Sequence, residues 1–175
     1  DFLASVHEAR EDYAQAQAAL QRAADVSPHN TVRQRLVGDT AAQNKDFLAA
    51  EKAYGRVIER SRGSSLRSVD DFANLSRVLV ERGDVTAARR VAGEMKREWR
   101  GDKQAELAVL VAESLCLDAE GTPERARELI ERALVLQAEV RAEAAAKGRH
   151  VSQRLEVDLA HACYAVGNKE AADRL

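Results

Sequence analysis

The side chains most able to carry out chemistry are scattered along this chain. Its four histidines are His7, His29, His150 and His161. None has a second histidine four positions on, or a cysteine at the spacing that a metal site requires. We interpret Ser64, Ser65 and Ser68 as linker residues rather than nucleophiles. Because the sequence has no Gly-rich phosphate loop, Gly-x-Ser-x-Gly elbow or nucleotide fingerprint, we predict no enzymatic activity, no metal and no cofactor.

The two cysteines, Cys116 and Cys163, each lie between apolar neighbours. We interpret them as buried free thiols that pack as small hydrophobic side chains. A lone disulfide or a reactive thiol is the alternative, although no basic helix N-terminus adjoins either cysteine. Free thiols favour a cytoplasmic location.

Two groups of basic residues could meet a partner. The first is Arg56, Arg60, Arg62 and Arg67, and the second is Lys96, Arg97 and Arg100 around Trp99. The first group could bind phosphate or an acidic surface, or it could be the exposed side of a helix end and its linker. In the second group, Trp99 could anchor a partner or close the end of its own helix.

The elements that position these residues follow from a pattern that occurs five times. A small residue is followed eight positions later by a helix-capping residue, and four positions after that by alanine. The sets are Ala4, Asp12, Ala16; Gly38, Asp46, Ala50; Ser76, Asp84, Ala88; Ser114, Thr122, Ala126; and Ala160, Asn168, Ala172. A recurrence of this length is typical of stacked helix pairs, and the small residues let their backbones approach closely.

The turns between paired helices have a common design. Three turns have a glycine where the first helix ends, followed by a residue whose side chain can cap the second helix. These turns are Gly83-Asp84, Gly121-Thr122 and Gly167-Asn168. Lys45-Asp46 keeps the cap without the glycine, and Pro123 suits the first position of a helix. Turns of about two residues require antiparallel neighbours.

These signals predict ten helices. They run over 1–9, 12–25, 30–43, 46–61, 69–82, 84–99, 103–119, 122–147, 150–166 and 168–175. Extra residues near 61–65 and 100–103 are expected in the connections. The Ala/Glu-rich stretch 138–147 is expected to add two or three turns to the eighth helix, ending at Gly148, with a disordered loop as the alternative.

The pattern resembles the tetratricopeptide repeat (TPR), over essentially the whole chain. The Leu-Gly pair in the first helix of a TPR corresponds here to Val37-Gly38, Leu75-Ser76 and Leu159-Ala160. The signature of the second helix corresponds to Ala126, Ile130 and Ala133. The resemblance implies an all-α, right-handed superhelical solenoid of about five antiparallel helix pairs in one domain, 1–175. The expected units are 1–28, 29–65, 66–101, 102–148 and 149–175.

In the TPR family, the first helices usually line a concave groove that holds a partner peptide or helix. The resemblance therefore implies groove positions at Arg35, Asp39, Gln43, Asn74, Arg77, Glu81, Val111, Leu115, Asp118, His161 and Tyr164. The alternative is a solvated face with internal Arg35–Asp39 and Arg77–Glu81 pairs four residues apart. Because the lysines of a carboxylate clamp are missing, we do not expect that clamp here.

A narrower resemblance concerns the runs Asp46-Phe47, 67–72 and 74–77. They look like the helical-repeat region that follows a receiver domain in some bacterial response regulators. The 175 residues contain no receiver residues, so such a domain would precede Asp1. Because residue 1 falls inside an expected helix, we expect the chain to be a piece of a longer protein.

Composition limits the function classes. With 45% hydrophobic and 4% aromatic residues, 175 residues can bury a core of small and medium aliphatic side chains. The 27 basic and 29 acidic residues disfavour nucleic-acid binding through phosphates, and no apolar stretch approaches the roughly 20 residues of a membrane span.

We therefore predict a protein-interaction or scaffolding module, and more specifically the output region of a bacterial two-component signalling protein. The alternative is self-association as a homodimer through terminal repeats, where Phe2, Leu3 and Leu175 could expose apolar surface. RNA binding by a similar helical repeat is a more remote alternative, since no basic groove is expected.

Overall fold

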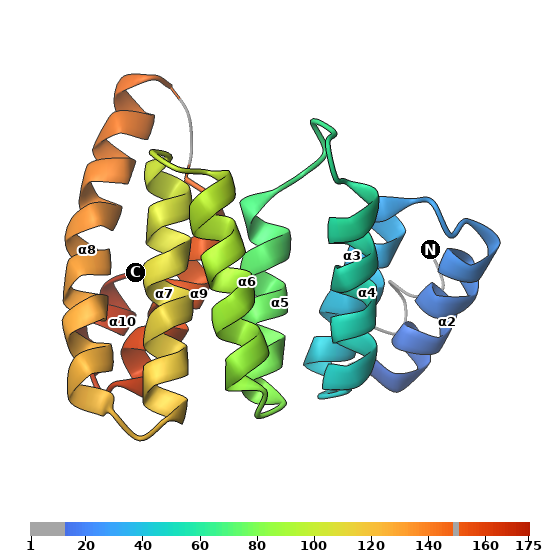
Figure 1. Cartoon of the computed structure of the whole chain (residues 1–175), viewed down its shortest axis with the longest axis horizontal. Coiled ribbons are helices and arrows are strands. Elements are labelled where there is room, and N and C mark those ends of the chain that lie inside the picture. Colours follow the sequence, from blue (N-terminus) through green and yellow to red (C-terminus); the bar gives the residue numbers. More distant parts are fainter. Residues whose placement is uncertain (1–12, 149–150) are drawn as a thin grey trace. The chain divides into compact units, whose positions relative to one another are not determined.

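A computed structural model describes residues 13–148 and 151–175, and every regular element within this part is a helix (Figure 1). The helices are α2 (Tyr13–Val26), α3 (Thr31–Gln43), α4 (Phe47–Arg60), α5 (Val69–Glu81), α6 (Val85–Glu98), α7 (Lys103–Ala119), α8 (Pro123–Ala146), α9 (Gln153–Ala165) and α10 (Lys169–Arg174). Their bounds agree with the predicted ones to within one residue, except that α9 begins at Gln153 rather than at 150. The helix predicted over 1–9 lies outside the described residues.

The predicted turn chemistry is present between paired helices. Asp46, Asp84 and Asn168 each accept a hydrogen bond from the backbone N–H three residues on, at 3.1, 3.0 and 3.2 Å. Gly83 and Gly167 take the left-handed conformation, with φ of 88° and 79°. A residue with a Cβ adopts this conformation at a cost, so these glycines fix where the first helix of each pair stops.

Thr122 departs from the prediction that its side chain caps α8. Its Oγ1 instead donates a hydrogen bond to the carbonyl of Leu117, at 2.8 Å, and the N-terminus of α8 has no side-chain cap. The hydroxyl thus adds a second hydrogen bond to a carbonyl at the end of α7 that already accepts from the backbone N–H of Thr122, at 3.0 Å. Pro123 compensates, because it removes one of the N–H groups that a cap would otherwise satisfy.

The chain divides into two compact units, Asp1–Arg82 and Gly83–Leu175, and the boundary falls inside the third predicted repeat. In unit 1, α3 packs against α2 and α4, and α4 packs against α5. Gly38 is essential to this packing, since a Cβ there would lie 2.8 Å from two ring atoms of the fully buried Tyr54. The small residue of the repeat therefore makes room for an aromatic ring of the paired helix.

Unit 2 is centred on α7, which packs against α6, α8 and α9. Eleven of its residues are buried, as expected for a helix that is apolar on almost all sides. Ile130 of α8 and Leu159 of α9 complete the core. The small repeat residues Ser114 and Ala126 are buried as well, so the packing role predicted for them is confirmed.

The predicted insertions appear where expected. Residues 61–68 connect α4 to α5, and 99–102 connect α6 to α7. Helix α8 has 24 residues and ends just before Gly148, whose φ is 61°. Its added turns are tied to the start of α7, because Lys103 forms ion pairs with Glu139, at 3.1 Å, and with Glu143.

Candidate functional site

The best-defined polar arrangement on the predicted groove lies in unit 1, where α3 meets α5. Arg35 binds the Asp71 carboxylate with two parallel hydrogen bonds of 2.7 Å, and also donates to the carbonyl of Leu66 at 3.0 Å. Asp71 is 2% exposed, whereas the Arg35 side chain is 30% exposed. The bonds to Asp71 raise the pKa of the guanidinium above its ordinary value. This fixed pair holds the two helices in register.

The main partner of Arg35 is not Asp39, as the alternative of local pairs expected, although the charge of Asp39 also helps to raise the pKa of Arg35. Arg35 bonds to Asp71, 36 residues away, while Asp39 accepts a 2.6 Å hydrogen bond from the hydroxyl of Tyr54. Tyr54 is the ring that Gly38 accommodates. The two charged groove residues of α3 are therefore oriented by contacts from two neighbouring helices, α4 and α5.

Asn74 lies one turn after Asp71 on α5. It is only 7% exposed, and within the described part of the chain its side-chain carbonyl oxygen accepts no hydrogen bond. Arg77, one turn further, is half-buried, while Gln43 and Glu81 lie at the ends of α3 and α5. The α3–α5 face thus combines fixed charges with an amide whose oxygen is buried and has no hydrogen-bond partner among the described residues.

Exposed aliphatic side chains on this face were not among the predicted groove residues. Val32 and Leu36, one turn apart on α3, are 60% and 38% exposed, and Leu66 in the α4–α5 connection is 60% exposed. Val32 and Leu36 fall on the same helical stripe as Asp39 and Gln43. The spacing of Val32 and Leu36 could have identified them from the sequence. The prediction named only polar residues of this helix stripe.

In unit 2, the predicted groove residues have different environments. Val111 and Leu115 of α7 are buried, at 4% and 8% exposure, and Asp118 is half-buried. On α9, His161 is exposed and Tyr164 is 50% exposed, with its hydroxyl 2.6 Å from Asp173. This hydrogen bond raises the pKa of Tyr164. Of the predicted residues in unit 2, those on α9 are therefore the most accessible.

Comparison with solved structures identifies the architecture. The chain matches the crystal structure of YrrB, described as a TPR protein with an unusual peptide-binding site, with a TM-score of 0.52. The match covers 97% of this chain and 77% of that one, at 14% sequence identity. The chain has a tetratricopeptide-repeat fold. The resemblance inferred from the repeat pattern is thus confirmed at the level of the fold.

Sequence comparison adds nothing to this result. No protein-family model matches the chain, and no curated protein matches it. The TPR fold is shared with YrrB, while most residues differ between the two proteins.

The first basic group does not form a single surface on the TPR scaffold. Arg67 stacks over the ring of Phe72, 4.8 Å from its centroid, and donates to the carbonyl of Ile58. Arg60 is hydrogen-bonded to His29, and Arg56 is exposed on α4. These contacts agree with the interpretation of the group as a helix end and its linker.

The second basic group surrounds the end of α6. Trp99 is the C-terminal capping residue of α6, is half-buried, and donates its backbone N–H to the carbonyl of Met95 at 3.1 Å. Lys96 and Arg100 are exposed, and with Trp99 they line a hollow over α7. Trp99 therefore closes its own helix and at the same time borders an open surface.

The cysteines are buried free thiols in the core of unit 2, as predicted. Burial raises the pKa of Cys116 to about 11 and also raises that of Cys163. Both thiols are therefore protonated at neutral pH, which makes them poor nucleophiles.

The described residues offer neither a metal site nor a membrane-spanning helix. No group of three or more of their His, Cys, Asp and Glu side chains is placed to hold a metal ion. None of the helices in the described ranges is both long enough and apolar enough to cross a membrane.

Proposed function

We propose that this chain is a non-catalytic protein-interaction module that binds a partner peptide on the α3–α5 face of unit 1. The TPR fold supports this class of function, and YrrB, which shares the fold, is described as having an unusual peptide-binding site. The helices and their side chains are already ordered before binding. Most of the conformational entropy lost on binding therefore comes from the partner.

The observation that carries the proposal is the fixed Arg35–Asp71 pair, whose partly exposed guanidinium has N–H groups that no hydrogen bond among the described residues uses. An extended peptide has one C=O acceptor per residue, which can accept a hydrogen bond from such an N–H group. Val32 and Leu36 on the same face offer apolar contact for an aliphatic side chain. We therefore expect a partner that places an aliphatic residue near the start of α3 and a backbone carbonyl near Arg35.

The test is a selection of short random peptides on the immobilised full chain. Binding of the recovered peptides is then titrated with wild type and with the double variant Asn74→Ala/Arg77→Ala. We expect this variant to weaken binding about tenfold or more, because it removes the charge of Arg77 and the polar side chain of Asn74 from the helix face that carries Asp71. A matched control replaces two exposed α4 residues, Lys52→Ala/Arg56→Ala, and should leave the affinity unchanged. If every recovered peptide binds both variants equally, the α3–α5 face is not the site.

Arg35 is left intact in this test for a structural reason. Removing it would leave the buried Asp71 carboxylate without its partner and so destabilise unit 1. A loss of binding in an Arg35 variant could therefore reflect unfolding rather than loss of a contact.

The resemblance to response-regulator repeats supports a more specific role, as the output region of a two-component protein in the cytoplasm. That role requires a receiver domain in the stretch preceding Asp1. Sequencing the gene upstream would test it, and an upstream segment without an acidic pair and a phosphoacceptor Asp would reject it.

A further inference from the structure

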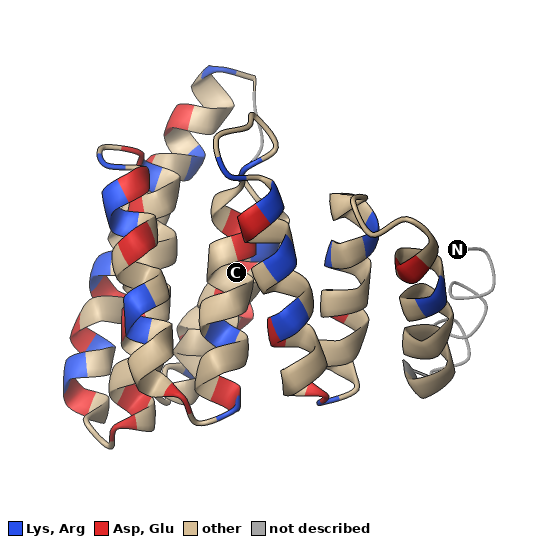
Figure 2. Cartoon of the chain, turned by 45° about the vertical axis from the view of Figure 1, so that its right-hand side comes forward, with Lys and Arg blue, Asp and Glu red and all other residues tan. Residues whose placement is uncertain are grey.

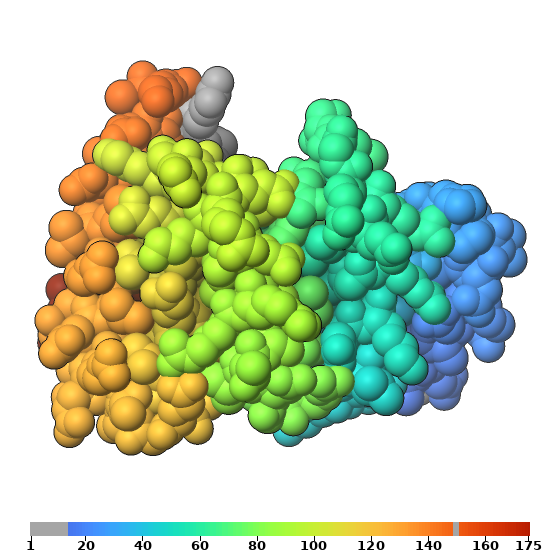
Figure 3. Space-filling view, viewed as in Figure 1, coloured from blue at the N-terminus to red at the C-terminus, as the bar shows by residue number. Residues whose placement is uncertain are grey.

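The buried stripe of α8 ends before the helix does. Its buried residues recur at helical spacing and are Ala126, Ile130, Ala133, Gln137 and Val140. Ala144 continues the stripe but is only half-buried, and the other residues of 141–147 are exposed. Figures 1 and 3 show this end of α8 projecting beyond the start of α7. Tertiary packing, which usually stabilises a helix in a protein, therefore contributes little to residues 141–147.

Exposed ion pairs hold the end of α8 on two sides. On one side, Lys103 at the start of α7 pairs with Glu139, at 3.1 Å, and with Glu143. On the other side, Arg141 pairs with Glu156 of α9, at 2.7 Å. The exposed fractions of these side chains range from 22% for Glu156 to 54% for Glu139. Ion pairs this accessible to water are individually weak, and salt screens them.

A hollow lies between the end of α8 and the start of α7. It has a volume of about 430 Å³. Residues 101–104 line one side, and the other side is lined by Val140, Glu143, Ala144 and Lys147. Val140 is 4% exposed, so it is the last residue of α8 that packs tightly. Beyond Val140, contact with α7 therefore depends mainly on the pair of Lys103 and Glu143 rather than on packed side chains.

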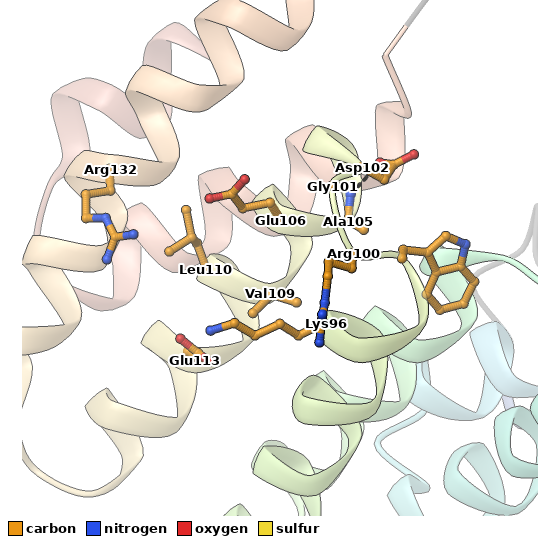
Figure 4. A pocket seen from close by; sticks show the side chains of 11 residues that line it. Lys96, Arg100, Gly101, Asp102, Ala105, Glu106, Val109, Leu110, Glu113 and Arg132 are labelled. Atoms are coloured by element: carbon orange, nitrogen blue, oxygen red, sulfur yellow. Dashed lines mark hydrogen bonds between the residues drawn. The ribbon is translucent and has the colours of Figure 1, made fainter.

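Carboxylates surround Lys103. Asp102 precedes it, and Glu106 follows it by one turn (Figure 4). Glu139 and Glu143 face it from α8, where charges of both signs occupy the last turns (Figure 2). Without Lys103, Glu139 and Glu143 would repel each other, because residues four apart on a helix are neighbours. The lysine therefore attracts the end of α8 and also offsets this repulsion.

The pairs of Lys103 are intact near neutral pH and are lost in acid. The hydrogen bonds that Lys103 donates to Glu143 and Glu139 raise its pKa. The first of these bonds lowers the pKa of Glu143, and the charge of Lys147 lowers it further. A glutamate with a lowered pKa stabilises the fold above its ordinary pKa, and this contribution disappears as the pH falls through the lowered value. The contribution of Lys103 is lost only as the pH rises through its raised pKa, so acid acts through the glutamates.

We propose that residues 141–147 form a strap that opens at high salt or in acid while the rest of unit 2 stays folded. The core of unit 2 does not depend on these ion pairs, because it is built from buried apolar side chains such as Leu107, Ile130 and Leu159. Opening makes Val140 the end of α8, widens the hollow and lengthens the connection to α9. Ionic strength and pH thereby control how much of the start of α7 is accessible.

Hydrogen exchange on the full chain tests the strap. Protection factors of the amides of residues 143–147 are measured by NMR at about 0.05 M and about 1 M NaCl, at neutral pH and at about pH 4, with intrinsic exchange rates corrected for pH. The test variant Lys103→Met keeps an aliphatic stem and removes the charge. The matched control, Arg89→Met, removes a cation that pairs with Glu120 through two hydrogen bonds elsewhere in unit 2. Neither residue is buried, so both variants are expected to fold.

In wild type, we expect the protection of the strap to fall about threefold or more at high salt, and also in acid, because both conditions weaken its attraction to α7 and α9. Lys103→Met should show reduced protection already at low salt and neutral pH, whereas Arg89→Met should behave like wild type. Adding Glu139→Gln and Glu143→Gln to Lys103→Met should recover part of the loss, since the two carboxylates then no longer repel each other.

The proposal is overturned if salt and acid leave the protection of residues 143–147 unchanged, or if Lys103→Met has no effect. It also fails if Arg89→Met lowers this protection as much, or if removing the two carboxylates recovers none of it. Loss of protection in α7 together with the strap would overturn it as well, because opening would then not be confined to the end of α8.

Discussion

At the scale of single residues, the Arg35–Asp71 pair is the strongest determinant of the α3–α5 face. Its two bonds join helices that belong to successive repeats, and its acidic partner is almost completely removed from water. A carboxylate in such a position is tolerated only while its charge is compensated. The pair therefore mainly stabilises unit 1. It also fixes the position of α3 relative to α5, the helix that carries Asn74.

A double-mutant cycle on this pair measures its contribution. We expect Asp71→Ala and Arg35→Ala each to lower the free energy of unfolding, with Arg35→Ala costing about 2–4 kcal/mol because it strands a buried charge. The double variant should cost clearly less than the sum of the two, since neither charge is then left unpaired. Urea unfolding followed by circular dichroism gives the three values. Additive losses would show that the two side chains do not interact in solution.

The sequence could predict that Arg35 faces the groove, but not what holds it there. From a sequence alone, the neighbours of a helical residue that can be identified are those three and four positions away on the same helix. This reasoning favoured Asp39 as the partner of Arg35. The actual partner is 36 residues away and becomes visible only once α3 and α5 are placed. The burial of Val111 and Leu115 has the same origin, because exposure depends on the helices that cover α7.

At the scale of helices and turns, the sequence predicted the bounds well, because each turn is marked by residues with strong conformational preferences. Glycine with positive φ, followed by a capping side chain, defines the end of one helix and the start of the next. Thr122 shows where this reasoning fails. A hydroxyl can donate to the preceding helix as well as accept from the following one, and sequence does not decide between them.

Lys45 is the exception among the turns and gives a prediction at this scale. It has a φ of 59°, in the left-handed region that the other paired turns assign to glycine. We expect Lys45→Gly to raise the free energy of unfolding by about 0.5–1 kcal/mol, because relief of the Cβ clash outweighs the added freedom of the unfolded chain. Thermal unfolding by calorimetry would measure this gain. Lys45→Ala retains a Cβ and should give none, so equal stabilities for the two variants would contradict the explanation.

At the scale of the whole molecule, the repeats form two compact units that each carry a distinct candidate surface. In unit 1 the α3–α5 face is organised by the Arg35–Asp71 pair, and in unit 2 the hollow over α7 is lined by cations and carboxylates together. A TPR fold accommodates both, because its packing uses small residues on the inside and leaves the outer side chains free to vary. The small inner residues recur in every repeat, so the fold could be predicted from them. The outer side chains vary from repeat to repeat, so the fold does not determine the partner.

Self-association is the remaining alternative, and the described part of unit 2 supplies an observation that favours it. Val157 and Tyr164 are two turns apart on α9 and are 56% and 50% exposed, with the exposed His161 between them on the same stripe. Exposed apolar stripes of this kind are frequent in contacts between proteins. Phe2 and Leu3, which were expected to contribute at the other end, lie outside the described residues.

If this stripe joins two copies, sedimentation velocity should show a coefficient that rises with protein concentration. Val157→Glu should then abolish the rise, since burying a carboxylate in the contact carries a large desolvation penalty. Leu48→Glu makes the same change at a residue of α4 with 52% exposure, and should leave association unchanged. A sedimentation coefficient independent of concentration would reject a dimer through α9. That result would leave His161 and Tyr164 free to contact a different protein, as the groove resemblance implies.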